Sequence, residues 1–111
     1  MGQFTKLPDS LPKSNITPLT IVTATSPSIA VTVADDLVRC DASLNPISVT
    51  LPTAVGNSGK VLHFKKTDGT LNIITVTAAS GEAIDGALFK RLTTQYQSLI
   101  ISSTGSGWDI L

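Results

Sequence analysis

Short apolar runs, each closed by proline, glycine, asparagine or aspartate, constrain this chain more than any other feature of its sequence. The clearest run is ISVTL at 47–51, where Ile47, Val49 and Leu51 alternate with hydroxyl side chains. A period of two residues is the signature of a half-buried strand. Pro52 follows at once and stops strand pairing. A chain built from such runs is predicted to be an all-β protein.

The same pattern predicts about eight to ten short strands separated by turns. The expected strands cover residues 19–23, 29–33, 37–40, 47–51, 60–67, 72–77, 88–93, 95–103 and 108–111. Strands of this length and spacing indicate a β-sandwich or a jelly-roll-like barrel. We find no internal repeat of the period that solenoid proteins show.

Two local units stand out within this pattern. Residues 41–66 are predicted to form a hairpin-like unit around a loop at 53–59, in which Gly56-Asn57 and Ser58-Gly59 can supply positive φ angles. The next two strands are predicted to form a tight hairpin closed by Asp68-Gly69, because Asp-Gly is a strong hairpin signal. The loop at 53–59 is also a candidate contact with other proteins.

The length of 111 residues predicts one domain, with an extended N-terminal arm at 1–17 and a β-sandwich module at 18–111. Prolines 8, 12 and 18 exclude a helix in the arm. The arm is either a disordered leader or a segment that docks onto a partner or a neighbouring subunit. Disordered tails contain few large apolar residues, so we favour docking. The candidate partner-binding residues are then Phe4, Leu7, Leu11 and Ile16.

Charge is sparse and balanced. Eight basic and eight acidic residues give zero net charge, and charged residues make up 14% of the chain, below the roughly 25% usual for soluble domains. Nucleic-acid binding is not expected without a basic excess. Lys60, Lys65 and Lys66 are read as a solvated edge or face. The deficit of charge indicates that other chains cover part of the surface.

No apolar run is long enough to span a membrane, and the N-terminus lacks the apolar segment of a signal peptide. We therefore expect no membrane partner and assembly in a cytoplasm. The single cysteine, Cys40, is predicted to be a buried small hydrophobe. Trp108 and Tyr96 are read as core or interface residues.

Catalytic equipment is not apparent. A nucleophile–base pair of Cys40 and His63 is disfavoured, because nothing places the two side chains together. One histidine and one cysteine cannot form a transition-metal site. The aspartates 35, 36 and 41 lack the spaced oxygen pattern of a calcium loop. We expect no enzymatic activity, no metal and no cofactor.

A series of short motifs occurs in a recognisable order and spacing. The motifs are VADD at 33–36, DAS at 41–43, ISVTLP at 47–52, GNSGK at 56–60, KKTD at 65–68, IDG at 84–86, LTTQYQS at 92–98 and GWDI at 107–110. Over about residues 20–111, this set resembles a β-rich module of tailed-bacteriophage virion proteins. Such modules recur in tail-fibre and receptor-binding proteins and in small capsid decoration (cement) proteins.

The resemblance implies a non-enzymatic virion protein that forms a homotrimer. The first function it implies is capsid decoration, in which a trimer on the outside of the head stabilises contacts between subunits of the major capsid protein. The protein would be assembled in the host cytoplasm and lie on the capsid surface. The alternative is a tail-fibre or baseplate module that binds other tail proteins or a host receptor. A carbohydrate-binding module of the host is a third class. The small size, with one module and one arm, favours decoration.

Overall fold

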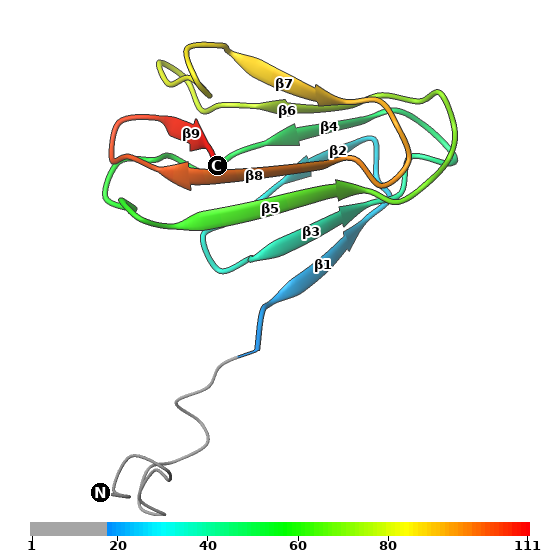
Figure 1. The fold of residues 1–111 in the computed structure, drawn as a ribbon, viewed down its shortest axis with the longest axis horizontal. Coiled ribbons are helices and arrows are strands. Elements are labelled where there is room, and N and C mark those ends of the chain that lie inside the picture. Colours follow the sequence, from blue (N-terminus) through cyan, green and yellow to red (C-terminus); the bar gives the residue numbers. More distant parts are fainter. Residues whose placement is uncertain (1–17) are drawn as a thin grey trace, which may run out of the picture.

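The protein is a two-layer β-sandwich in which the chain crosses repeatedly from one sheet to the other (Figure 1). The computed structural model describes residues 18–111. Its strands there are β1 (Ile21–Ala24), β2 (Ser28–Ala30), β3 (Leu37–Cys40), β4 (Ile47–Thr50), β5 (Val61–Lys66), β6 (Ile74–Thr77), β7 (Phe89–Leu92), β8 (Ser98–Ser103) and β9 (Trp108–Ile110). The prediction of an all-β chain with short strands is confirmed.

Each sheet mixes parallel and antiparallel pairs. Sheet A has the order β1-β3-β5-β8-β9, and sheet B has the order β2-β4-β6-β7. As far as β6, successive strands alternate between the sheets, and neighbours within each sheet are parallel. Parallel neighbours need a long crossover connection. Here each connection between parallel neighbours contains one strand of the opposite sheet. The first six strands therefore wind like a flattened β-helix, and we call each full turn, from one strand to its parallel neighbour in the same sheet, a coil.

This winding differs from the antiparallel order of a jelly roll. Four of the seven strand pairs are parallel. The coils are also unequal in length. Ile21 pairs with Leu37, which closes a short coil, whereas Leu37 pairs with His63 and closes a much longer one. Unequal coils leave no fixed period in the sequence, which explains why no solenoid repeat is visible there.

Both predicted hairpins are wrong. The strands β4 and β5 lie in different sheets, and so do β5 and β6. The loop at 53–59 therefore crosses between the layers, although Gly56 and Gly59 do have the predicted positive φ angles. The Asp-Gly signal misleads at 68–69 because the Asp68 carboxylate turns into the protein and pairs with a buried lysine.

The buried ion pair of Lys66 and Asp68 holds two crossover loops together. Lys66 is fully buried, which corrects its reading as a solvated lysine, and its Nζ lies 2.6 Å from Asp68 Oδ2. The amide of Ala42 donates to Asp68 Oδ1 at 2.8 Å. The amide and the hydroxyl of Thr70 donate to Asp68 Oδ2. Asp68 thus joins the loop after β3 to the loop after β5.

These contacts also decide the charge of Asp68. Burial by itself would raise the pKa of this carboxyl group. The hydrogen bonds from Lys66, Thr70 and the Ala42 amide outweigh burial and hold the pKa well below its usual range. Asp68 is therefore ionised wherever the protein is folded at ordinary pH.

The core between the sheets consists of the inward-facing residues of all the long strands. Phe64, Ile101 and Cys40 are fully buried, as the alternation predicts. Trp108 is 2% exposed, and its indole nitrogen has no hydrogen-bond partner in the described part of the chain. Trp108 therefore stabilises the fold through the apolar area it buries, which confirms its reading as a core residue.

We predict an asymmetry between the two members of the ion pair. Asp68→Asn leaves the Lys66 ammonium buried without an anion and should lower the free energy of unfolding by about 3–5 kcal/mol. Lys66→Met removes the buried charge and leaves Asp68 with its other donors, so its loss should be roughly half or less of that. Urea unfolding of both variants measures the difference. Equal losses would contradict a dominant role for the unpaired lysine.

The same carboxylate predicts weakening in acid. The pKa of Asp68 is lower in the folded chain than in the unfolded chain, so the unfolded state binds more protons as the pH falls. The stabilisation is complete above the unfolded pKa of about 3.9 and is lost towards the folded pKa. Melting temperatures between pH 5 and pH 2 should fall in the wild type and fall less in Asp68→Asn. Parallel curves would refute this assignment.

Candidate functional site

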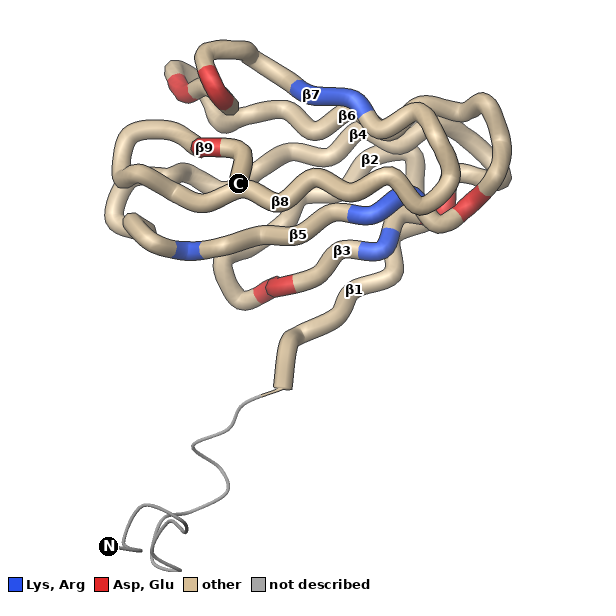
Figure 2. Tube along the Cα trace, viewed as in Figure 1, with Lys and Arg blue, Asp and Glu red and all other residues tan. Residues whose placement is uncertain are grey.

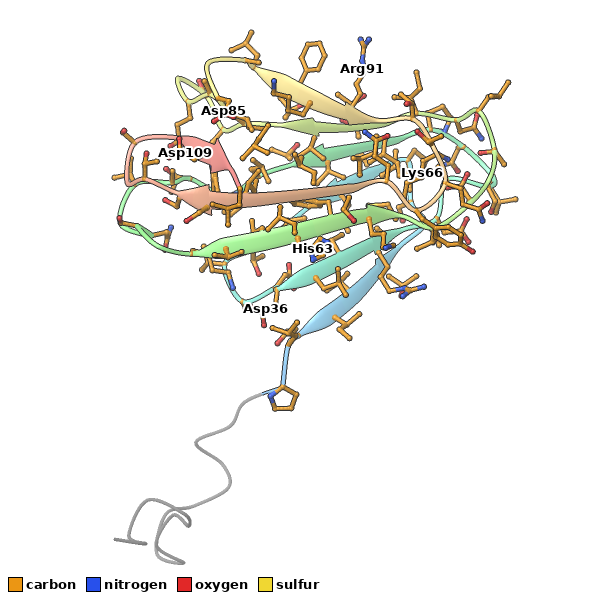
Figure 3. The ribbon with its side chains drawn as sticks, in the orientation of Figure 1. Asp36, His63, Lys66, Asp85, Arg91 and Asp109 are labelled. Atoms are coloured by element: carbon orange, nitrogen blue, oxygen red, sulfur yellow. The ribbon has the colours of Figure 1, made fainter. Side chains whose placement is uncertain are left out.

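The two outer faces of the sandwich differ in chemistry. On sheet B, the outward-facing residues of three parallel strands are Ser28, Ser48 and Thr75, which lie in register. Arg91 of β7 pairs with Thr75 and extends this row. Its side chain points out from the sandwich (Figure 3). This row of sheet B therefore presents hydroxyl groups and one guanidinium group to solvent, and the exposed Phe89 lies two residues from Arg91 on β7.

Sheet A carries an apolar row instead. Ile21, Leu37, His63 and Ile100 stand in register on β1, β3, β5 and β8 and face outward; we call these four residues the sheet A row. Ile21 is 59% exposed, and the other three are half-buried. Beside this row, the outward-facing Val61 is also exposed. Ile21, Leu37 and Ile100, together with Val61, thus form an apolar outer surface around His63, and such a surface marks an interaction site.

The sheet A row lies between groups of opposite charge. Arg39 and Lys65 follow it at the C-terminal ends of β3 and β5. Asp36 precedes β3 and binds Lys60 Nζ at 2.7 Å. That hydrogen bond, together with one from the Thr20 amide, holds the pKa of Asp36 below its usual range. Figure 2 shows basic residues at the C-terminal ends of β3 and β5 and acidic residues just before β3.

An exposed aromatic residue borders the basic end. Tyr96 is 63% exposed and has a φ of +66°, a left-handed conformation that costs a non-glycine residue about 1–2 kcal/mol. Its amide donates to Lys66 O at 2.6 Å, which holds this turn against β5. Lys65 Nζ lies 5.9 Å from the centre of the Tyr96 ring. Tyr96 and Lys65 thus form a cation–π pair at the edge of the surface.

The arrangement does not bring nucleophile and base together. Cys40 points into the core, where burial raises the pKa of its thiol to about 12. His63 points outward from the same sheet, so the two side chains lie on opposite faces. The His63 Nε2 atom is shielded from solvent and has no hydrogen-bond partner among the described residues. Within residues 18–111, no three metal-ligating side chains form a cluster.

Sheet B also has an open groove of about 670 Å³. Pro27, Pro46 and Leu71 supply apolar walls, whereas Ser48 and Arg91 supply polar groups. The Arg91 guanidinium lies 4.9 Å from the centre of the Phe89 ring. This groove offers hydrogen bonds and one positive charge, so it suits a polar or anionic ligand.

The four arm residues predicted to bind a partner, Phe4, Leu7, Leu11 and Ile16, lie outside the described residues. The loop at 53–59 is described and is well anchored. Glu82 accepts hydrogen bonds from the Thr53 hydroxyl at 2.6 Å and the Ala54 amide at 2.8 Å, and Ser103 Oγ donates to Ala54 O. Val55 is 62% exposed in this loop, so the loop remains a candidate contact.

Sequence reasoning missed the sheet A row because its members come from four separate strands. The alternation within each strand did place His63 opposite Leu62 and Phe64, and Ile100 opposite Leu99 and Ile101. The unusual feature was an apolar residue on the outward side of several strands. Only strand order and register show that these residues adjoin.

The chain matches no protein-family model, and no curated protein is significantly similar to it. No helix in residues 18–111 is long and apolar enough to cross a membrane. The surface chemistry described above therefore carries the functional argument.

Proposed function

We propose that this chain is a structural protein of a tailed-bacteriophage virion, and specifically a capsid decoration protein. In this proposal it binds the outside of the head as a homotrimer and stabilises contacts between major capsid subunits without enzymatic activity. Its motif series is similar to that of phage virion modules. The low charge and the all-β sandwich are compatible with dense packing on a shell.

The observation that carries the proposal is the sheet A row. Ile21, Leu37 and Ile100 are apolar, and apolar residues on an outer face gain free energy when a second protein covers them. Arg39 and Lys65 add positive charge at one end of this face, whereas Asp36 at the other end is already paired with Lys60. We therefore assign the contacts between subunits of the trimer to the outer face of sheet A.

A tail-fibre or baseplate module is the second candidate. The sheet B groove favours it, because Arg91 and the hydroxyl groups of Ser48 and Thr75 could bind a polar receptor. An apolar subunit interface would serve a trimer in either location. Decoration remains the first proposal, because residues 18–111 expose few aromatic side chains for a receptor platform.

Substitution on the sheet A row should break self-association. In Ile21→Asp, a charged side chain replaces an exposed isoleucine at the edge of sheet A and would have to be buried in the subunit contact. We expect the concentration at which half of the trimer dissociates to be at least about tenfold higher for this variant than for the wild type. Thr50→Asp, on the outer face of sheet B, is the matched control and should associate normally. Sedimentation velocity measures both. A monomeric wild type, or an unchanged Ile21→Asp trimer, would refute the assigned interface.

Copy number separates the two locations. A decoration protein should occur in virions in proportion to the major capsid protein, because its sites repeat over the whole shell. A tail component should occur in a small, fixed number of copies. Quantitative mass spectrometry of purified virions gives this ratio directly. A handful of copies per particle would overturn decoration and favour the tail module.

A further inference from the structure

The end of the sandwich formed by β1 and β2 is open. Val22 of β1 and Ile29 of β2 face inward but are only half-buried. Their partners in the next strands, Val38 and Val49, have no exposed surface at all. The core therefore continues to the coil that contains β1 and β2, and no described residue covers it there. Figure 1 shows β1 at the free edge of its sheet.

Both sheets also leave backbone groups without a described partner at this end. The carbonyl groups of Thr20 and Ala24 accept bonds from the side of β3. Because backbone groups alternate in direction along a strand, those of Ile21 and Thr23 point away from β3. On β2, the Pro27 carbonyl accepts from the Ser48 amide, and the Val31 amide donates to the Thr50 carbonyl, so these two residues face β4. By the same alternation, the backbone amide and carbonyl groups of Ser28 and Ala30 point away from β4.

The opposite end of the sandwich is covered. Ile84 forms isolated bridges with Ala87 and Trp108 and is fully buried. The segment around Ile84 thereby joins the two sheets beyond β7 and β9. The described residues thus cover one end of the sandwich and leave the end at β1 and β2 without a cap. Proteins built from successive β-coils need a cap with a polar outer side at each end.

We propose that residues 5–17 of the same chain cap this open end as one further coil. The first described coil has the pattern Val22-x4-Pro27-x3-Val31, and the preceding residues repeat it as Leu7-x4-Pro12-x3-Ile16. Val22 and Val31 both face inward in the described coil. Leu7 and Ile16 are the residues that would cover the exposed edge of the core.

Length and composition fit this role. The proposed coil from residue 5 to Ile21 would have the same length as the described coil from Ile21 to Leu37. Asp36 accepts a hydrogen bond from the Thr20 amide at 2.7 Å, so the chain is anchored where it enters β1. With Leu7 set against Val22, Lys13 and Asn15 correspond to the exposed Ser28 and Ala30, so these two residues supply the polar outer side of a cap.

The cap would leave two arm residues for other contacts. In the alignment that sets Leu7 against Val22, Phe4 and Leu11 correspond to Leu19 and Ser26, which are both exposed. The cap is independent of the proposed virion function, since it requires only the open end of this fold.

Amide hydrogen exchange of the full chain tests the cap. If a strand covers each edge, the outward-pointing amides of Ile21, Thr23, Ser28 and Ala30 should exchange at least about tenfold more slowly than in an unstructured peptide. Exchange at unprotected rates in the wild type would overturn the proposal, whatever any variant does.

Two double variants identify the occupant. Leu7→Asp with Ile16→Asp should remove the protection of these four amides, whereas the control pair Phe4→Asp with Leu11→Asp should keep it. Equal protection in both double variants would refute the assignment of Leu7 and Ile16. Protection that disappears on dilution would assign the cap to a second copy of the chain and overturn a cap from the same chain.

Discussion

The ion pair of Lys66 and Asp68 is the contact on which the winding of this chain depends. Parallel strands cannot be joined by tight turns, so each coil must leave one sheet, cross the core and return. The Asp68 carboxylate binds the Ala42 amide in the crossover loop after β3 and the Thr70 amide in the crossover loop after β5. The lysine that neutralises this carboxylate comes from β5 itself. One buried charge pair thus joins the two crossovers that lead from sheet A to sheet B after β3 and after β5, although both charges lose their hydration.

The coil gives the molecule surfaces of unequal character. Strands in register bring single outward residues into rows. Three apolar residues and His63 form the sheet A row, and three hydroxyl residues and Arg91 form a polar row on sheet B. The two ends differ as well, because the segment around Ile84 covers only one of them. A subunit with an apolar outer face is suited to assembly, and we favour assembly over catalysis for that reason.

Local patterns predicted the strands well and their partners poorly. The runs at 47–51 and 95–103 contain β4 and β8, because alternation depends only on neighbouring residues. The hairpin expected at Asp68-Gly69 failed because the turn propensity of aspartate gave way to a buried charge pair. The candidate surface was likewise invisible, since His63 and Ile100 adjoin only after β5 pairs with β8.

The sequence by itself determined the class of fold and the side of each strand that faces the core, because both follow from a period of two residues. It also predicted that Cys40 would be buried and that Trp108 would be a core or interface residue. Only the tertiary structure decided the order of the strands, the burial of Lys66 and the rows on the two outer faces. Those features depend on contacts between residues far apart in the chain, and unequal coils remove the repeat that would reveal them.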